Sequence, residues 1–463
     1  MKKRITLLFI LGIVSVSIAQ KETDKWFFGS GAALDFSSGS PIVINPSPLY
    51  TSEGTAAVSD VTGKLRFFTN GVDVYDSTKT IMPNGVGLMG DISTTQSAMI
   101  VPNPASSNQF YIFTAGADGA GDFRYSIVDM SLNGALGDVM IANKNILLTD
   151  SITEKIAAIR DGANGIWIVT HKWGTNQFYS FHLTTAGLYP AVISSVGTVH
   201  NTSVIQNTYG QLKFNNCGTR LACAVGYQDI VELFDFNLTT GVVSNPMTIN
   251  MSDNVYGVEF SPSGNFLYVT SYFSSCKLAQ FDISLATLPL ILASKVPLSA
   301  TDDLYGLQLG PDGKIYLARS FATPFLGVIN NPEVAGFGCN YVENGLDLDP
   351  FFMGVNGALS LPSFMQSYLK LATGATCLTT EISESNLEIS YSVYPNPSAS
   401  EFSIDGSHKD IQISIYDCLG KLIEQHQHIN SVFVFGKNYS KGVYFVNVID
   451  KKGTKSVKIL KTN

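Results

Sequence analysis

A glycine-rich hexapeptide is the first segment whose residue types could do chemistry. Residues 85–90 read Gly-Val-Gly-Leu-Met-Gly and satisfy GxGxxG, the spacing that lets a backbone approach a dinucleotide pyrophosphate. That chemistry needs a strand before the glycines and a helix after them. Here a Met-Pro-Asn turn precedes them and a Ser/Thr-rich stretch without helical periodicity follows. We therefore interpret the glycines as a turn and predict no nucleotide cofactor.

Histidines and carboxylates are the next side chains that could serve acid–base or metal chemistry. Glu424, His426 and His428 alternate, so a strand would place all three on one face at intervals of roughly 6.6 Å. A solvated strand face explains the same alternation more simply. His182 falls at a recurring strand position and is interpreted as structural, whereas His171 follows a strand and could face a surface. We predict no metal site and name no catalytic residue.

Known catalytic signatures do not occur in the chain. It carries no GxSxG, HExxH or Walker-type glycine loop. The acidic pairs Asp118 with Asp122 and Asp347 with Asp349 lack the acid density of a calcium loop. A glycosidase needs two carboxylates that converge in space, which spacing along the chain cannot show. We therefore expect no cofactor, and a non-catalytic function is favoured.

Six cysteines could form disulfides or bind zinc. No CxxC pair occurs, so a zinc site of the usual spacing is not expected. Buried free thiols explain most of the six. Cys339 and Cys377 both lie in glycine-rich segments near the end of the long repeat region, and we predict a disulfide between them.

The composition indicates what kind of fold must position these residues. Of 463 residues only 14% are charged, while 28 phenylalanines, 20 tyrosines and 41 glycines point to many short strands joined by tight turns. The net charge of −8 provides no basic field to hold nucleic acid, so no nucleic-acid partner is expected. An apolar content of 45% excludes a disordered chain.

A repeat of about fifty residues organises most of the chain. A turn followed by a short apolar strand recurs with its turn residue at positions 63, 108, 165, 218, 264 and 313. The strands are nearly continuous in apolar residues, as expected when both faces are buried between stacked sheets. Three or four antiparallel strands per repeat predict an all-β fold, a β-propeller.

Seven blades fit between residues 20 and 376, since a blade takes about 40–50 residues. Six copies are visible, and the seventh is predicted to combine both ends of this region. Residues 26–29 and 33–36 would pair with residues 358–361, or with the nearby 364–371, and so close the ring.

Short segments at the two ends have other roles. Residues 1–19 combine a basic start with an apolar core and small residues, which predicts a signal peptide cleaved between Ala19 and Gln20. No later stretch is expected to cross a membrane. Residues 377–391 are interpreted as a linker, and the alternating strands of residues 392–463 predict a small β-sandwich.

The last 72 residues resemble the type A sorting domain of the type IX secretion system of Bacteroidetes. The resemblance rests on Val-Tyr-Pro-Asn-Pro at 393–397, Ile-Tyr-Asp with Gly-Lys at 415–421, Gly-Val-Tyr at 442–444 and Lys-Ile-Leu-Lys at 458–461. It implies that the type IX machinery is a partner and that the protein is secreted or attached to the outer cell surface. The residues that it assigns to the sorting signal are Pro395, Asn396, Pro397, Gly420, Gly442, Tyr444, Lys458 and Lys461.

The long repeat region also resembles exported propellers of the YVTN or WD-repeat-like kind. The likeness lies in segments such as Trp-Phe-Phe-Gly at 26–29 and Gly-Pro-Asp-Gly-Lys at 310–314. It implies fold and export but no chemistry. The Trp-Asp dipeptide of true WD repeats is absent from the sequence.

We therefore expect an exported binding or interaction protein whose blade loops contact a glycan, peptide or protein. Two alternatives stay open: a propeller hydrolase or lyase acting on extracellular polysaccharide, and a structural component of the cell surface or gliding machinery. Two or more acids with a histidine or tyrosine at one mouth of the channel would indicate the enzyme. A flat, aromatic or neutral mouth would indicate binding.

Overall fold

Two compact units make up the chain in the computed structural model, one from Met1 to Cys377 and one from Leu378 to Asn463. The structure describes residues 20–44, 46–119, 121–271, 277–300, 304–320, 323–369, 393–405, 411–417, 421–429, 431–450 and 453–462. Within these ranges, no helix combines the length and apolar character that crossing a membrane requires.

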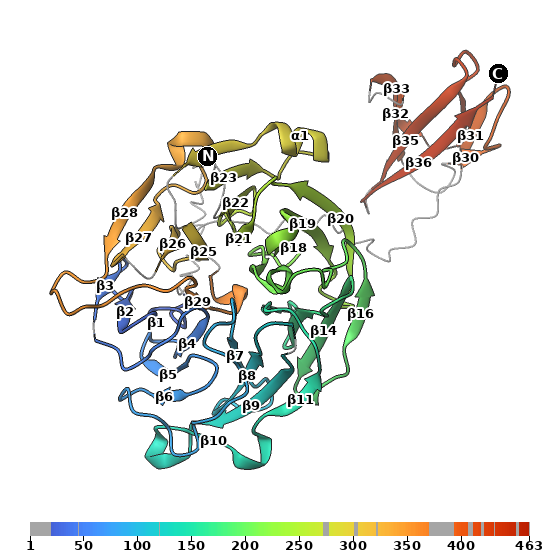
Figure 1. Cartoon of the computed structure of the whole chain (residues 1–463). Helices are drawn as coiled ribbons and strands as arrows, with labels where there is room; N and C mark the ends of the chain where they lie inside the picture. Colours follow the sequence, from blue (N-terminus) through green and yellow to red (C-terminus); the bar gives the residue numbers. More distant parts are fainter. Residues whose placement is uncertain are drawn as a thin grey trace, which may run out of the picture. The chain divides into compact units, whose positions relative to one another are not determined.

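Seven sheets follow one another around a central axis in the described part of the first unit (Figure 1). We number these blades 1 to 7 in chain order. In blades 3 to 7 the strands are consecutive and the strand order runs outward from the first strand, whereas in blade 2 a strand from the C-terminal segment precedes β4. Blades 1 to 4 contain β1 (Lys25–Phe28), β2 (Ala32–Asp35) and β3 (Ile42–Val43); β4 (Thr55–Ser59), β5 (Leu65–Thr69) and β6 (Val74–Asp76); β7 (Ala98–Pro102), β8 (Gln109–Ala115), β9 (Phe123–Asp129), β10 (Asp138–Val139) and β11 (Ile146–Thr149); β12 (Ala157–Arg160), β13 (Ile166–His171), β14 (Gln177–Thr184), β15 (Gly187–Leu188) and β16 (Val192–Ser195).

The remaining blades are regular four-stranded sheets, and short helices lie in the connections. Blades 5 to 7 contain β17 (Leu212–Phe214), β18 (Arg220–Val225), β19 (Ile230–Phe236) and β20 (Val243–Asn250); β21 (Val255–Phe260), β22 (Phe266–Ser271), β23 (Leu278–Asp282) and β24 (Val296–Ser299); β25 (Leu304–Leu309), β26 (Ile315–Arg319), β27 (Phe325–Ile329) and β28 (Tyr341–Asp347). The helices are α1 (Leu288–Ala293) and the 3-10 turns η1 (Asn133–Ala135), η2 (Ile141–Asn143), η3 (Ile205–Thr208), η4 (Gly226–Gln228), η5 (Gly336–Cys339) and η6 (Gln366–Leu369).

The recurring turn of the sequence joins the first and second strands of each of blades 2 to 7. Gly63, Gly218, Gly264 and Gly313 have φ of 86°, 70°, 78° and 79°, a left-handed conformation that glycine adopts without strain. The hairpins on either side pair in antiparallel register. The predicted all-β propeller with its seven blades is confirmed.

Blade strands are buried on both faces, as their continuous apolar sequence predicts. All residues of β13 and of β21 are buried. Residues from adjacent blades share hydrophobic clusters; one such cluster joins Phe214 and Leu221 of blade 5 to Ile159 and Val169 of blade 4. The ring is therefore held by sheet-to-sheet packing, and its central strands present side chains to the channel.

The ring closes differently from the sequence prediction. β1 pairs with β2, and the C-terminal segment makes only isolated bridges to that blade, from Asn356 to Ser30 and Gly31. The C-terminal segment forms one strand, β29 (Pro362–Ser363), which pairs in parallel with β4 of blade 2. Pro362 has no N–H to donate, so this segment suits the edge of a sheet better than a position inside one. The predicted pairing with residues 26–29 and 33–36 is thus wrong.

The second unit is a small sandwich of two sheets, as predicted. One sheet has the order β30–β31–β34 and the other β33–β32–β35–β36. Buried side chains of both sheets, among them Phe402 and Ile404 on one and Ile413, Val446 and Ile459 on the other, form a common core. The strands are β30 (Val393–Tyr394), β31 (Phe402–Asp405), β32 (Ile411–Asp417), β33 (Leu422–Ile429), β34 (Val432–Phe435), β35 (Gly442–Asp450) and β36 (Gly453–Lys461).

Candidate functional site

One end of the propeller channel gathers carboxylates and tyrosines. The inner strands β4, β12, β17 and β21 begin at this end, which we call the mouth. Glu53 precedes β4, Glu154 precedes β12, Tyr209 precedes β17, and Tyr256 is the second residue of β21. Since inner strands of a propeller run side by side around one axis, their first residues converge. These four residues are the mouth cluster.

Glu53 and Tyr256 form the hydrogen-bonded centre of the mouth cluster. The Tyr256 hydroxyl donates to Glu53 Oε2 at 2.8 Å and lies 3.1 Å from Ser360 Oγ of the C-terminal segment. Burial, and then the neighbouring Glu154, raise the pKa of Glu53 well above its usual range. Burial and the Glu53 carboxyl likewise raise the pKa of Tyr256. Glu53 can therefore act as a hydrogen-bonding acid in a poorly hydrated site.

Glu154 has a structural role beside this pair. It is fully buried, and its Oε2 accepts hydrogen bonds from the backbone N–H and the hydroxyl of Thr95, both at 2.9 Å. Its Oε1 accepts from Asp118 N at 3.2 Å and from Thr208 Oγ1 at 3.3 Å. Burial raises the pKa of Glu154. With both oxygens bonded to protein donors, this carboxylate fixes three loops rather than facing a ligand.

Lys155 is a buried cation whose ammonium group donates hydrogen bonds to backbone carbonyls. Its Nζ donates to the carbonyl oxygens of Thr208 at 2.6 Å and Tyr209 at 2.8 Å. Burial lowers the pKa of Lys155 to about 8. The ammonium group thereby ties the segment before β17 to β12 and has no exposed surface to offer an anion.

The half-buried tyrosines give the mouth its aromatic surface. Burial, followed by the acids Glu154, Asp118 and Glu53, raises the pKa of Tyr209 to about 12. Tyr209 and Tyr305 are both partly exposed, and Tyr305 lies edge-on to Tyr256 with 5.5 Å between ring centroids. The mouth thus offers aromatic rings within a negative surrounding, an arrangement that suits neutral or cationic groups and disfavours anions.

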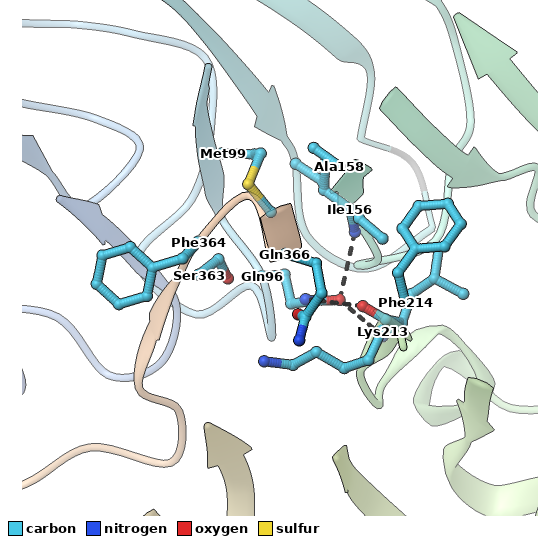
Figure 2. A pocket seen from close by; sticks show the side chains of 11 residues that line it. Gln96, Met99, Ile156, Ala158, Lys213, Phe214, Ser363, Phe364 and Gln366 are labelled. Atoms are coloured by element: carbon cyan, nitrogen blue, oxygen red, sulfur yellow. Dashed lines mark hydrogen bonds between the residues drawn. The ribbon is translucent and has the colours of Figure 1, made fainter. Parts of the chain in front are cut away.

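The channel below the mouth is filled. Gln96 Oε1 accepts from Ile156 N at 3.3 Å and Leu212 N at 2.8 Å, which links three inner strands (Figure 2). Lys213 Nζ lies 2.6 Å from Gln308 Oε1 and 3.1 Å from Glu259 Oε2. The cavity among these side chains has a volume of about 10 Å³, about the room that one water molecule needs.

The C-terminal segment covers the opposite end of the channel. After β29, η6 is buried along its whole length. Ser367 Oγ accepts from the backbone N–H of Arg160 at 2.8 Å, and Gln366 Nε2 donates to Asn216 Oδ1 at 2.8 Å. Arg160 and Asn216 lie at the far ends of inner strands, next to the recurring turns.

A second hollow lies on the outer edge of the propeller. It has a volume of about 420 Å³ and is lined by apolar and aromatic residues from β11, β14 and the segment around β15 and β16. Tyr179 and Tyr189 both line it, and half of Tyr189 is exposed, at 50%. This rim groove contains no charged lining residue.

Two buried imidazoles stack close to the mouth. The rings of His171 and His200 lie 3.6 Å apart, and neither nitrogen of His171 has a hydrogen-bond partner. Burial, and then the Lys155 ammonium, lower the pKa of His171 to about 3; burial lowers that of His200 well below its usual range. Burial also raises the pKa of Cys223, whose Sγ lies 3.9 Å from His200 Nε2, to about 12. His171 is thus a neutral core residue, not the surface residue that the sequence allowed.

His171→Phe should flatten the acid side of the stability profile. Because the folded-state pKa of about 3 is below the unfolded value of 6.5, the unfolded chain binds a proton first, and stability is lost as pH falls below 6.5. Between pH 7.5 and 5.5 the wild-type chain should lose about 1.4 kcal/mol through this group, and the variant should not. Urea denaturation at both pH values measures the difference. Equal losses in the two proteins would show that His171 is protonated in the folded state.

Residues assigned to the sorting signal come together in the second unit. Asn396 Nδ2 donates to the carbonyl of Lys458 at 2.7 Å, and Asn396 Oδ1 accepts from Leu460 N at 2.9 Å. Lys461 is buried, with its Nζ bonded to the carbonyls of Ser400, Gly436 and Lys437. The Tyr444 hydroxyl donates to Ser440 O at 2.9 Å.

Other predicted positions have different outcomes. Pro395 and Pro397 each follow a cis peptide bond, and Gly442 begins β35. Ala19, Cys377 and Gly420 lie outside the described residues, and the cleavage before Gln20 stays a prediction.

The predicted disulfide needs correction. Cys339 is a free thiol, fully buried in η5, so it does not pair with Cys377. Its thiol belongs to the hydrophobic cluster of blade 7 and interacts with the Tyr268 side chain. Cys217, in the turn between β17 and β18, is disulfide-bonded instead. Glycine-rich surroundings therefore misled the choice of cysteine.

The mouth cluster escaped the sequence analysis, although a signal for it exists. Residues 53–58 read Glu-Gly-Thr-Ala-Ala-Val and residues 154–159 read Glu-Lys-Ile-Ala-Ala-Ile, so a glutamate recurs three residues before an Ala-Ala strand. Likewise, residues 256–257 and 305–306 are both Tyr-Gly at the start of an inner strand. Aligning inner strands by their first residues would have placed these acids and tyrosines at one end of the channel.

Comparison with known proteins assigns the C-terminal unit. Residues 392–462 match the family described as the secretion system C-terminal sorting domain. The chain is thus a β-propeller protein that carries a sorting domain. This domain implies type IX secretion to the cell surface or to the outside, as expected from its motifs. No curated protein sequence shows a significant match to the chain.

Solved structures similar to the chain are propeller proteins of low sequence identity. A candidate 6-phosphogluconolactonase from Bacteroides fragilis is 13% identical with a TM-score of 0.48, over 73% of this chain and 97% of its own. A second candidate 6-phosphogluconolactonase, from Bacteroides uniformis, is 14% identical with a TM-score of 0.41, over 83% of this chain and 98% of its own. The periplasmic gluconolactonase PpgL of Pseudomonas aeruginosa is 11% identical with a TM-score of 0.38, over 79% and 94%.

Proposed function

We propose that the protein is an exported binding protein that receives a neutral glycan at the mouth of its propeller. The observation that carries this proposal is that the two glutamates of the mouth cluster differ in exposure and in hydrogen bonding. Glu154 is buried and bonded to protein donors on both oxygens, whereas Glu53 retains 7% exposure beside the partly exposed Tyr209 and Tyr305. One acid among aromatic rings fits recognition, because a double-displacement or water-activating mechanism needs two accessible carboxylates.

The chemistry of the mouth supports a neutral, hydroxyl-rich ligand. A tyrosine ring packs against the C–H face of a sugar, and the Glu53 carboxyl can exchange hydrogen bonds with sugar hydroxyls. The Lys155 ammonium lies next to Tyr209, but it donates its hydrogen bonds to the carbonyl oxygens of Thr208 and Tyr209. An anionic ligand at the Tyr209 ring would meet the nearby acids Glu154 and Asp118, which disfavour negative charge there.

A hydrolase or lyase acting on extracellular polysaccharide is the second candidate. The observation that favours it is the Tyr256 hydroxyl at 2.8 Å from Glu53, an acid whose pKa is raised by burial and by Glu154. A carboxyl with a raised pKa can serve as a general acid. Turnover of an oligosaccharide that is lost in Glu53→Gln would establish this candidate over binding alone.

Tyr209→Ala should weaken binding of the recognised glycan at least ten-fold, since it removes a partly exposed ring at the mouth. The full chain is tested by calorimetry against a panel of neutral, acidic and amino oligosaccharides, without prior choice of ligand. Tyr189→Ala is the control, because Tyr189 is a tyrosine of 50% exposure that lies in the rim groove and not at the mouth. Loss of binding in the control but not in Tyr209→Ala would move the site to that groove. A preference for acidic sugars would overturn the proposed ligand class.

We also propose the borders of the exported protein. The division after Cys377 supports a propeller of residues 20–376, a linker of residues 377–391 and a sorting domain from residue 392. Signal cleavage between Ala19 and Gln20 completes this organisation.

A further inference from the structure

Two residues of the sorting motif, Tyr444 and Lys461, are buried in the sandwich, and the exposed Asn396 is bonded to its backbone. Asn396 bonds to the backbone of β36 at Lys458 and Leu460, and Lys461 is 2% exposed with its ammonium on backbone carbonyls. Tyr444 is 8% exposed, and its hydroxyl is bonded to Ser440. Groups that are buried and bonded cannot be touched by a partner without unfolding. The recognition surface must therefore lie on exposed residues of the domain, such as Lys458, rather than on Tyr444 or Lys461.

The outer face of the four-stranded sheet carries a row of side chains in which Leu422 and Phe445 are exposed and Tyr416 is partly exposed. Cross-strand pairs set the row: Leu422 on β33 lies opposite Tyr416 on β32, and Tyr416 lies opposite Phe445 on β35. Phe445 in turn lies opposite Lys458 on β36. Paired residues of a sheet point to the same face, so the four side chains form one continuous row across the sheet.

Side chains of this row are accessible to solvent, whereas their neighbours along the strands point into the core. Leu422 is 47% exposed and Phe445 39%, whereas Ile415 and Val446, the next residues along the strands, are fully buried in the core. Leu460, also 39% exposed, lies opposite Val443 and so shares the outer face. We call Leu422, Tyr416, Phe445 and Leu460 the outer-sheet patch. An aromatic and aliphatic surface of this kind, kept exposed on a small domain, is typical of an interaction site.

The net charge of the sorting domain indicates which charge its binding partner should carry. Residues 392–463 contain nine lysines and six acidic residues, a net charge of +3. Residues 20–391 contain 17 basic and 31 acidic residues, a net charge of −14. Lys458 stands at the end of the row itself and is exposed. An apolar row that ends in an exposed lysine, on a domain of net positive charge, is complementary to a partner with an apolar surface edged by carboxylates.

We propose that the outer-sheet patch is the surface by which the type IX secretion machinery recognises this protein. The partner is a component of that machinery with an apolar groove edged by carboxylates. Leu422, Tyr416 and Phe445 enter the groove, and Lys458 meets its acidic edge. The buried motif residues hold the sheet that displays this row.

Export of the full chain from its native host tests the proposal. The double variant Leu422→Thr/Phe445→Thr keeps strand-compatible side chains and removes the apolar row. Val432→Thr/Val434→Thr is the matched control, since these valines are 51% and 48% exposed on β34 of the other sheet. We expect surface and secreted protein to fall at least ten-fold in the first variant, and to stay near the wild-type amount in the control.

Hydrogen exchange of the β35 and β36 amides in each purified full-length variant separates recognition from folding. The proposal requires wild-type exchange protection together with lost export in the Leu422/Phe445 variant. Normal export of that variant overturns it, as does an equal export loss in the Val432/Val434 control. A change from dimer to monomer with normal export would assign the patch to a second copy of the chain, and also overturns it.

Discussion

Replacing Glu259 by alanine should lower the free energy of unfolding of the propeller by about 3–5 kcal/mol. Glu259 is fully buried on β21, and its Oε2 accepts from Leu309 N at 3.0 Å and lies 3.1 Å from Lys213 Nζ. Its Oε1 accepts from Phe260 N at 3.1 Å. Removal leaves a buried ammonium and two backbone N–H groups without this acceptor, because little water can enter the filled channel.

Tryptophan fluorescence during urea denaturation measures this loss in the full chain. The three tryptophans lie at positions 26, 167 and 173, so the signal reports on the propeller alone. The double variant Lys213→Met/Glu259→Leu should be more stable than Glu259→Ala, since it removes the unpaired cation together with the acid. Asp150→Ala, which breaks an exposed pair with Lys172, should change little. An effect of Glu259→Ala no larger than that of Asp150→Ala would contradict the role assigned to the channel pair.

Much of the fold could be predicted because it is written in local patterns. A tight turn such as that at Gly264 between two apolar strands specifies a hairpin by itself, and six hairpins spaced by about fifty residues predict a ring. Closure could not be predicted in the same way. The partner of β29 is set by where the chain meets blade 2 after travelling round the ring, and Pro362 limits which edges it can join.

The mouth cluster shows what local patterns omit. Glu53 and Tyr256 are 203 positions apart in sequence, yet their side chains are hydrogen-bonded. Only the radial arrangement of the strands brings them together, because each lies at the start of a different inner strand. The pKa shift of Glu53 depends in turn on burial by loops from further blades, so residue type alone could not indicate it. On a propeller, the arrangement of the strands determines which distant residues form a site, so a local sequence motif alone does not identify it.

The sorting motif illustrates the opposite case, in which the residues were found but their physical role was hidden. A lysine in a C-terminal motif suggests a charge presented to a partner. Lys461 is instead 2% exposed, whereas Lys458 of the same motif is exposed on the same strand. The difference follows from register: Lys461 pairs with Gly442, whose missing side chain leaves room, while Lys458 pairs with Phe445 on the outer face.

Lys461→Met should unfold the end of the sorting domain and abolish export. The ammonium donates to the carbonyls of Ser400, Gly436 and Lys437, so it joins β36 to the segments that flank β31 and β34. Leaving these buried acceptors without a donor costs about 3 kcal/mol. A domain of some 70 residues has about 4–10 kcal/mol of stability in total, so the loss is a large share of it. Methionine preserves the length of the side chain, which confines the change to the lost charge and hydrogen bonds.

Lys458→Met is the folding control for this variant, because it removes the same charge from the same strand at an exposed position. Hydrogen exchange of the β35 and β36 amides in the full chain should speed up at least ten-fold in Lys461→Met and stay unchanged in Lys458→Met. Tryptophan fluorescence should show an unaltered propeller in both, since no tryptophan lies beyond residue 173. Equal protection in the two variants would mean that Lys461 contributes to recognition rather than to the fold. Fast exchange together with lost export would show that Lys461 acts by stabilising the folded sorting domain that the secretion machinery recognises.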